Sequence, residues 1–114
     1  MTLTFEEFKK TELRVAKVLD VQEIPGADRL WKLLIDVGSE KKEIVAGIKM
    51  HYTREALLGK SIIVVNNLTP TVIRGVESNG MLLAASVEGG SASGGKSLTI
   101  LTLDKEVPPG SPVG

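Results

Sequence analysis

The sequence has no cysteine among its 114 residues, and only 4% of them are aromatic. The missing cysteines exclude disulfides, thiolate nucleophiles and zinc–thiolate sites. With so few aromatic rings, the core has to be built from aliphatic side chains. No apolar run is long enough to cross a bilayer, and the N-terminal stretch TLTFEEFKK lacks the basic and apolar regions of a signal peptide. We therefore expect a cytoplasmic protein with no membrane partner, and the methionine at position 1 favours a complete protein.

Net charge is also absent, because 14 lysines and arginines are balanced by 14 aspartates and glutamates. A protein that coats nucleic acid through bulk charge carries an excess of positive charge, so the composition argues against that class. A local patch of basic residues remains compatible with zero net charge. If this chain binds phosphates, a few well-placed cations have to do so.

The order of predicted elements indicates a small barrel. A short helix is expected at residues 4–10, where Thr4 and Glu7 have the spacing of a capping box. A helical turn is expected at residues 53–58, between the third and fourth strands. Alternating or β-branched runs predict strands at residues 13–21, 30–37, 43–48, 61–65, 81–87 and 98–103. We predict an all-β, five-stranded OB-fold barrel with a short N-terminal helix and a C-terminal strand or extended segment. Residues 1–114 are expected to form one domain.

One literal motif match points to a different class of protein. Residues 90–97, GSASGGKS, fit the phosphate-binding P-loop pattern, with Lys96 for the phosphates and Ser97 for magnesium. A P-loop needs a helix directly after its lysine, whereas SLTILTL alternates and is β-branched, which is typical of a strand. We therefore interpret residues 89–95 as a flexible linker, with a nucleotide-binding enzyme that uses Lys96 as the alternative.

Catalytic chemistry has little support elsewhere in the sequence. His51 is the only histidine and stands in a predicted loop, without a partnered nucleophile or enough further ligands for a metal. Glu6 and Glu7 lie on the predicted N-terminal helix, where carboxylates favour the helix dipole and stay solvated. We therefore expect no catalytic residue, no metal and no cofactor.

The stretch IRGVESNGMLLAA, residues 73–85, carries the most suggestive chemistry. Arg74 offers a planar fork for a phosphate or a base edge, Ser78 can hydrogen-bond a ribose or base, and Met81 can lie against either. The same residues are also consistent with a salt-bridged or solvated loop arginine and a simple turn at Ser78 and Asn79, and a methionine such as Met81 is more often part of the barrel core than a contact. Composition alone does not decide between these interpretations.

Several motifs in order resemble a known family. They are RVAKV at residues 14–18, PGADRL at 25–30, DVG at 36–38, IVAGI at 44–48, NNLTP at 66–70 and above all IRGVESNGMLLAA at 73–85. Together they resemble the tRNA-binding domain shared by the C-terminal region of methionyl-tRNA synthetase, free-standing dimeric tRNA-binding proteins and the endothelial monocyte-activating polypeptide. The similarity runs from about Phe5 to Pro112.

The resemblance implies an OB-fold that binds tRNA largely by shape and has no catalytic role. It further implies a homodimer and, as a partner, a methionyl-tRNA synthetase catalytic subunit. Trp31, beside one of the implied contacts, is expected in the core, with a base-stacking surface as the alternative. A protein-interaction or dimerisation module with weakened RNA affinity is the alternative function. Carried onto this sequence, the tRNA-facing positions are Lys32, Asn67, Arg74, Ser78 and Met81, with Arg29 and Lys17 as further candidates on the same barrel face.

Overall fold

The computed structural model describes residues 1–88 and 95–114. Nearly all of the linker predicted at residues 89–95 lies outside the described residues. The same is true of most of the P-loop match at residues 90–97. Within the described part, no helix combines the length and the apolarity needed to cross a membrane.

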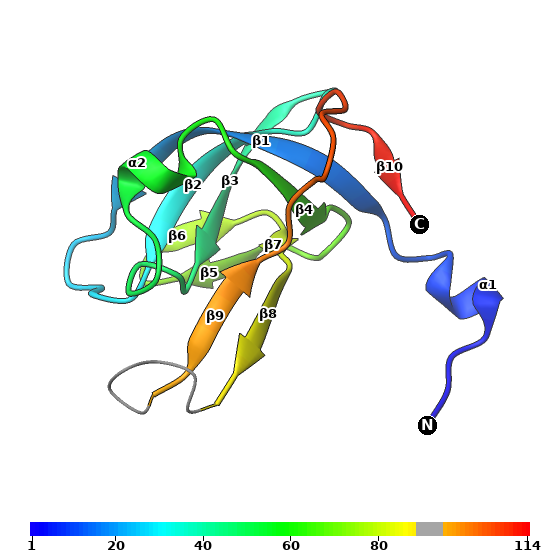
Figure 1. Ribbon diagram of the computed structural model, residues 1–114, viewed down its shortest axis with the longest axis horizontal. Helices are drawn as coiled ribbons and strands as arrows, with labels where there is room; N and C mark the ends of the chain where they lie inside the picture. Colours follow the sequence, from blue (N-terminus) through cyan, green and yellow to red (C-terminus); the bar gives the residue numbers. More distant parts are fainter. Residues whose placement is uncertain (89–94) are drawn as a thin grey trace.

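The N-terminal helix α1 (Phe5–Phe8) is shorter than predicted, although its capping box is confirmed. The hydroxyl oxygen of Thr4 accepts the backbone N–H of Glu7 at 3.1 Å, and the Glu7 carboxylate accepts the backbone N–H of Thr4 at 3.1 Å. None of the four helical residues is buried. Because no face of α1 packs against the barrel to stabilise it, the helix does not extend beyond its first turn. In Figure 1, α1 stands away from the body of the protein.

A curled antiparallel sheet forms the body and confirms the predicted all-β, OB-like fold (Figure 1). The first strand, β1, pairs with β4 through its first half and with β2 through its second half. Its register shifts between Val18 and Asp20, and the extra residue lets the strand bend from one neighbour to the other. The strand order is β3-β2-β1-β4-β7, with β1 (Leu13–Glu23), β2 (Trp31–Asp36), β3 (Lys41–Ala46), β4 (Ser61–Val65) and β7 (Met81–Leu82).

The strand predicted at residues 81–87 is wrong as a single element. It ends after Leu82, and a new strand β8 (Ala84–Val87) pairs with β9 (Ser97–Ile100) in a separate hairpin below the barrel in Figure 1. Between them, the N–H of Leu83 still donates to the carbonyl of Ile63 at 2.9 Å. Because β8 is exposed along its whole length, no buried face keeps it on the barrel. The strand predicted at 98–103 is correspondingly shorter and ends at Ile100.

A second hairpin was not predicted. Strands β5 (Thr71–Ile73) and β6 (Val76–Ser78) are joined by Arg74 and Gly75, whose φ angles are +52° and +80°. Two consecutive positive φ angles are the geometry of a type I′ turn, which matches the twist of the two strands. Asn-Gly is the usual sequence signal for this turn. The pair Arg74-Gly75 lacks the asparagine, so the sequence did not predict the turn. The stretch interpreted as a loop is therefore a hairpin with Arg74 at its tip.

The barrel interior is mainly aliphatic, as the composition predicts. Helix α2 (Arg54–Leu57), capped by Thr53, inserts the fully buried Leu57 into it. Trp31 is also buried, and its indole N–H donates to the carbonyl of Tyr52 at 2.8 Å, which confirms the predicted core position. The remaining core side chains include Val18, Val21, Leu33, Ile35, Ile44, Ile62 and Val64.

The C-terminal segment returns to the barrel and ends as β10 (Pro112–Val113), paired with β1. Its approach depends on two glycines that face each other. A Cβ on Gly38 would lie 2.8 Å from the carbonyl oxygen of Pro109, and a Cβ on Gly110 would lie 2.7 Å from that of Val37. Neither position has room for a side chain, so the close packing of this segment requires both glycines.

Candidate nucleic-acid interface

Hairpin β5–β6 is fastened to the outer edge of β3 through Ser78. The Ser78 hydroxyl accepts the backbone N–H of Val45 at 2.9 Å and donates to the carbonyl of Gly80 at 3.2 Å. Next to it, the N–H of Asn79 donates to the carbonyl of Glu43 at 2.9 Å. Only 5% of Ser78 is exposed, and its hydroxyl is used within the fold. The side chain predicted to face tRNA therefore holds the hairpin in place.

Lys32 lies beside this attachment point, because it is the cross-strand partner of Val45 in the β2–β3 pair. Its ammonium is 3.5 Å from a carboxylate oxygen of Glu43, and both side chains remain partly accessible to solvent. The positive charge is thus partly compensated by a neighbouring acid. An exposed ion pair of this kind contributes little to stability, so an incoming phosphate can compete for Lys32.

Met81 borders a small hollow beneath the hairpin. About 49% of the residue is exposed, so it is not the core residue that the alternative interpretation assumed. The hollow has a volume of about 180 Å³. Its walls come from β3, from the connection after β4, from β5 and from β7, and they include Val45, Leu68, Thr69, Thr71, Ile73 and Met81.

Arg29 and Arg74 line one hollow of about 370 Å³ at the end of the barrel. Arg29 comes from the turn between β1 and β2, and Arg74 comes from the tip of hairpin β5–β6. The other two arginines of the chain are paired with acids, Arg14 with Glu12 and Arg54 with Asp20. Neither Arg29 nor Arg74 has a side-chain hydrogen bond or ion pair with the described part of the chain, although Asp28 also lines the hollow.

Arg29 also borders a second and larger hollow, of about 520 Å³. Met50, His51 and Lys96 stand around it, on the connection after β3 and at the start of β9. The sequence drew attention to His51 and Lys96 only for catalytic chemistry, which did not connect them with Arg29. In the sequence, His51 and Lys96 are distinguished only as basic residues in predicted loops. The fold shows that these loops meet the loop that carries Arg29.

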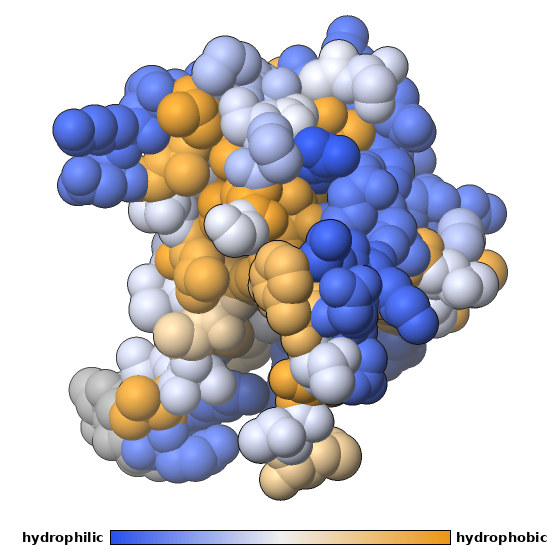
Figure 2. Space-filling model, turned by 90° about the vertical axis from the view of Figure 1, so that its right-hand side faces the viewer, coloured by the Kyte–Doolittle hydropathy of each residue, from blue (hydrophilic) through white to orange (hydrophobic). Residues whose placement is uncertain are grey.

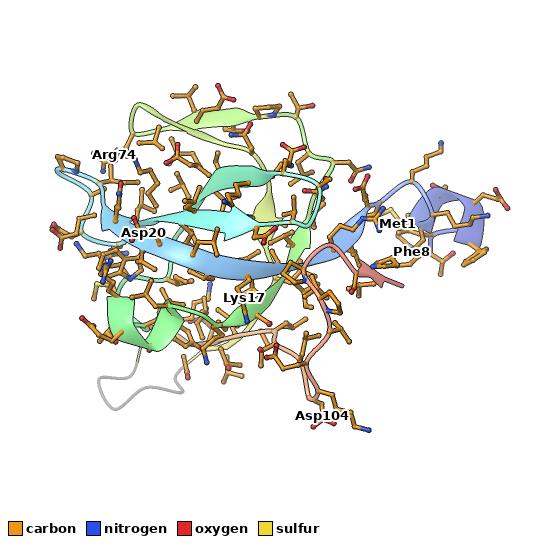
Figure 3. All side chains as sticks on the ribbon, turned by 90° about the horizontal axis from the view of Figure 1, so that it is seen from above. Met1, Phe8, Lys17, Asp20, Arg74 and Asp104 are labelled. Carbon is orange, nitrogen blue, oxygen red and sulfur yellow. The ribbon has the colours of Figure 1, made fainter. Side chains whose placement is uncertain are left out.

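The Asn67 side chain is turned toward the start of β1. Its amide oxygen accepts the N–H of Glu12 at 2.9 Å, and its amide nitrogen donates to the carbonyl of Lys10 at 2.6 Å. Lys17 lies apart from the predicted cluster, with its ammonium 3.8 Å from a carboxylate oxygen of Glu106. Figure 3 shows Lys17 and Arg74 on different sides of the barrel. The fold thus places Arg29 and Arg74 around one hollow, and Ser78 and Met81 around another that Lys32 borders through Val45. Lys17 and Asn67 line neither of these two hollows.

A polar network fixes the corner from which the chain leaves β4. The Lys42 ammonium donates to the backbone and side-chain oxygens of Asn66 at 3.0 and 2.8 Å. Asn66 in turn donates to the Glu12 carboxylate at 2.9 Å, and the same oxygen accepts from Arg14 at 3.1 Å. The hydrogen bond from Asn66, followed by that from Arg14, lowers the pKa of Glu12 below its usual value. This corner precedes Leu68 and Thr69, so the network positions one wall of the small hollow.

Other chemistries receive no support from this arrangement. Among residues 1–88 and 95–114, no group of three or more histidine, aspartate or glutamate side chains is placed to hold a metal ion. Strand β9 begins at Ser97, immediately after Lys96. The helix on whose N-terminus a P-loop phosphate rests is therefore replaced by a strand.

Comparison with known proteins supplies a family. The family described as "Putative tRNA binding domain" matches residues 13–112. The chain is 47% identical to the methionine–tRNA ligase of Thermotoga maritima over 111 residues, which are 97% of this chain and 16% of that enzyme. It is 44% identical to the ligase of Methanococcus aeolicus over 108 residues, 95% of this chain and 15% of that enzyme. The chain thus spans only a small part of these ligases.

Several solved structures resemble the whole chain. A methionyl-tRNA synthetase-related protein from Pyrococcus horikoshii superposes with a TM-score of 0.86 at 34% identity, over 100% of this chain and 99% of that one. The CsaA chaperone from Bacillus anthracis superposes with a TM-score of 0.84 at 28% identity, over 100% of both chains.

Proposed function

Since the chain belongs to the tRNA-binding domain family, we propose that it is a non-catalytic module that binds tRNA, with residues 1–114 acting as one domain. The observation that carries the proposal is the placement of Arg29 and Arg74. Two arginines from loops far apart in the sequence line one hollow, and within the part of the chain that the structure describes no acid is bonded to either guanidinium. A guanidinium without a protein partner is available for bidentate contact with a phosphate.

Recognition of the shape of the RNA follows from the positions of these cations in the fold. Arg29, Lys32 and Arg74 belong to three different elements, so the fold fixes the spacing between the phosphates that they would contact. Phosphate contacts position a nucleic acid without reading its sequence. Because the chain as a whole has no net charge, the attraction depends on these local cations. Lys96 and His51 would extend the contact from Arg29 toward the larger hollow.

The other predicted residues take different parts in this proposal. Met81 supplies an apolar surface, whereas Ser78 and Asn67 act by holding the hairpin and the corner in place. Lys17 would meet tRNA only if the RNA extended around the barrel.

We further propose that two copies associate through the face that carries both termini. Leu3, Phe5 and Phe8 are exposed on and before α1, which contacts little of the barrel. Figure 2 looks onto this side and shows apolar side chains gathered in the middle of it. Covering such a surface removes apolar area from water and stabilises association. A homodimer would present two tRNA-binding faces to one folded RNA.

A methionyl-tRNA synthetase is the proposed partner, because the ligases similar to this chain contain the matching region as a small part of a longer enzyme. In this proposal the module raises the tRNA affinity of the catalytic part, either as a subunit or domain of it or as a free-standing cytoplasmic protein. The module itself performs no step of the reaction.

The alternative function is a protein-interaction module with little affinity for RNA. The zero net charge and the exposed apolar side chains near the termini are the observations in its favour. Fluorescence anisotropy with labelled bulk tRNA across a salt series separates the two functions. We expect micromolar or tighter binding that weakens steeply with salt, because phosphate contacts release counterions. Absence of binding at low salt, together with a stable dimer, would instead support the interaction module.

A further inference from the structure

The small hollow beneath hairpin β5–β6 has a composition unlike that of the arginine-lined hollow next to it. Among the residues that the structure describes, no charged side chain lines it. Leu68 and Met81 stand on its walls although 45% and 49% of each residue is exposed to solvent. Apolar side chains that stay accessible around a concavity indicate a surface that a ligand covers.

The walls favour a flat, neutral group with a polar edge. Leu68, Ile73 and Met81 offer apolar contact for its faces. Thr69 and Thr71 offer hydroxyl groups for its edge, and the bond from the Thr71 hydroxyl to the Thr69 carbonyl is long, at 3.5 Å. With a volume of about 180 Å³, the hollow has room for a single small group and not for a helix of any kind.

The surroundings of the hollow identify that group. Lys32 lies beside Val45 on one wall, as its cross-strand partner, and Arg74 directly follows Ile73 on another. A neutral pocket with cations on two sides matches a nucleotide, whose base is neutral and whose flanking phosphates are negative. An apolar peptide side chain would use the pocket but would gain nothing from the two cations.

We propose that this hollow receives one unpaired base of the bound RNA. The inference rests on the proposed tRNA binding and makes it more specific, because a base that is stacked inside a duplex cannot enter the hollow. Recognition then combines the phosphate spacing set by the cations with the presence of an unstacked nucleotide at one point. Single-stranded loops and ends of folded RNA supply such bases.

The hollow is built before any ligand arrives. Ser78 fastens the hairpin above it through the bond to Val45, and the network of Lys42, Asn66 and Glu12 holds the corner before Leu68. A preformed pocket spares the ligand the free-energy cost of ordering these loops.

The test compares two RNAs and three variants at one salt concentration. The RNAs are bulk tRNA and a blunt, fully paired RNA duplex of similar length. Met81→Ala removes an apolar wall, and Thr71→Val removes a hydroxyl while keeping the shape. Val72→Ala is the matched control, because Val72 is an exposed apolar residue of the same hairpin that does not line the hollow. Thermal denaturation of each variant verifies that the fold is kept.

We expect Met81→Ala to weaken tRNA binding about five- to tenfold, which is the low end of the loss found when an aromatic stacking partner of a base is removed, since methionine offers a smaller apolar surface. Thr71→Val should weaken it to a smaller extent, and binding of the duplex should stay the same for all variants. Unchanged tRNA binding by Met81→Ala, or equal losses for tRNA and duplex, would overturn the inference and leave the proposed function standing. Failure of the unmodified protein to bind either RNA would overturn the proposed function and the inference with it. Displacement of tRNA by an uncharged apolar peptide, abolished in Met81→Ala, would assign the hollow to a protein ligand.

Discussion

The Ser78 hydroxyl accepts the backbone N–H of Val45 at 2.9 Å, and this bond joins hairpin β5–β6 to the edge of the barrel. Ser78→Ala would leave that N–H and the carbonyl of Gly80 without their side-chain partner. An unsatisfied group in a buried setting costs about 1–3 kcal/mol, so we expect the free energy of unfolding to fall by about 2 kcal/mol. Urea denaturation measures this change. Ser86→Ala, at an exposed position on β8, should change stability by less than about 0.5 kcal/mol, and equal effects of the two substitutions would contradict the assignment.

Arg74 contributes a positive charge to the proposed tRNA contact and has a backbone conformation that is unfavourable for arginine. One substitution distinguishes the effect of the charge from the effect of the backbone. Arg74→Asn places Asn-Gly, the preferred pair, in the type I′ turn, so the thermal stability should stay the same or rise. Removal of the charge should weaken binding of unrelated tRNAs to a similar extent and reduce the slope of log K against log salt by about one.

The control for this prediction is Lys105→Ala, which also removes one positive charge. Lys105 follows Asp104, which Figure 3 shows on a side of the protein far from Arg74. The salt slope should barely change in this variant. A change in discrimination between tRNAs caused by Arg74→Asn would show that Arg74 reads sequence.

The network around Glu12 makes stability depend on pH in the acid range. Because its hydrogen bonds to Asn66 and Arg14 lower the pKa of Glu12 in the folded state, the charged form stabilises the fold above the ordinary pKa of 4.5. This contribution is lost as the pH falls below 4.5 and through the lower pKa of the folded state. Glu12→Gln should therefore lower the melting temperature at neutral pH, and its difference from the unmodified protein should shrink in acid. A difference that is independent of pH would contradict the role of the charge.

Lys96 tests the alternative of a nucleotide-binding enzyme against RNA binding. We expect no shift in melting temperature on addition of ATP and magnesium, because β9 starts directly after Lys96 and offers no helix N-terminus for a phosphate. Lys96→Ala should instead weaken tRNA binding with a reduced salt slope, as expected for one lost phosphate contact. An ATP-dependent stabilisation that disappears in Lys96→Ala would revive the P-loop interpretation.

Phe8 tests the proposed dimer. Full burial of a Phe side chain contributes about 1.5–3 kcal/mol, and a symmetric interface would cover the exposed 40% of Phe8 in each of two copies, so Phe8→Glu should weaken association at least about tenfold. Sedimentation velocity across a concentration series measures this effect. Leu19→Glu is a closely matched control, since 40% of Phe8 and 39% of Leu19 is exposed. A dimer that tolerates Phe8→Glu as well as Leu19→Glu does not form through α1.

The elements that sequence reasoning predicted correctly are those whose signal is local. Strand β4 was predicted with its observed bounds, because SIIVV is a β-branched run that is buried on both faces. The capping box of α1 was predicted because Thr4 and Glu7 interact within one turn. Hairpin β5–β6 was missed because its turn contains Arg74 where the usual signal has asparagine. The break at Leu83 was missed because MLLAASV has a continuous apolar appearance, although its second half is exposed.

The sequence by itself determined the family, the barrel and the identity of the cations, since motifs, alternation and residue type are all local properties. Only the tertiary structure decided which of those residues work together. Arg29 and Arg74 share a hollow because the turn after β1 and the tip of β5–β6 meet at one end of the barrel. The side chains of Ser78 and Asn67 are engaged in hydrogen bonds within the fold, and their partners, Val45 and Glu12, come from distant segments of the chain. Hydrogen-bond partners and neighbouring charges are set by contacts between segments remote in the chain, and no local pattern of residues records them.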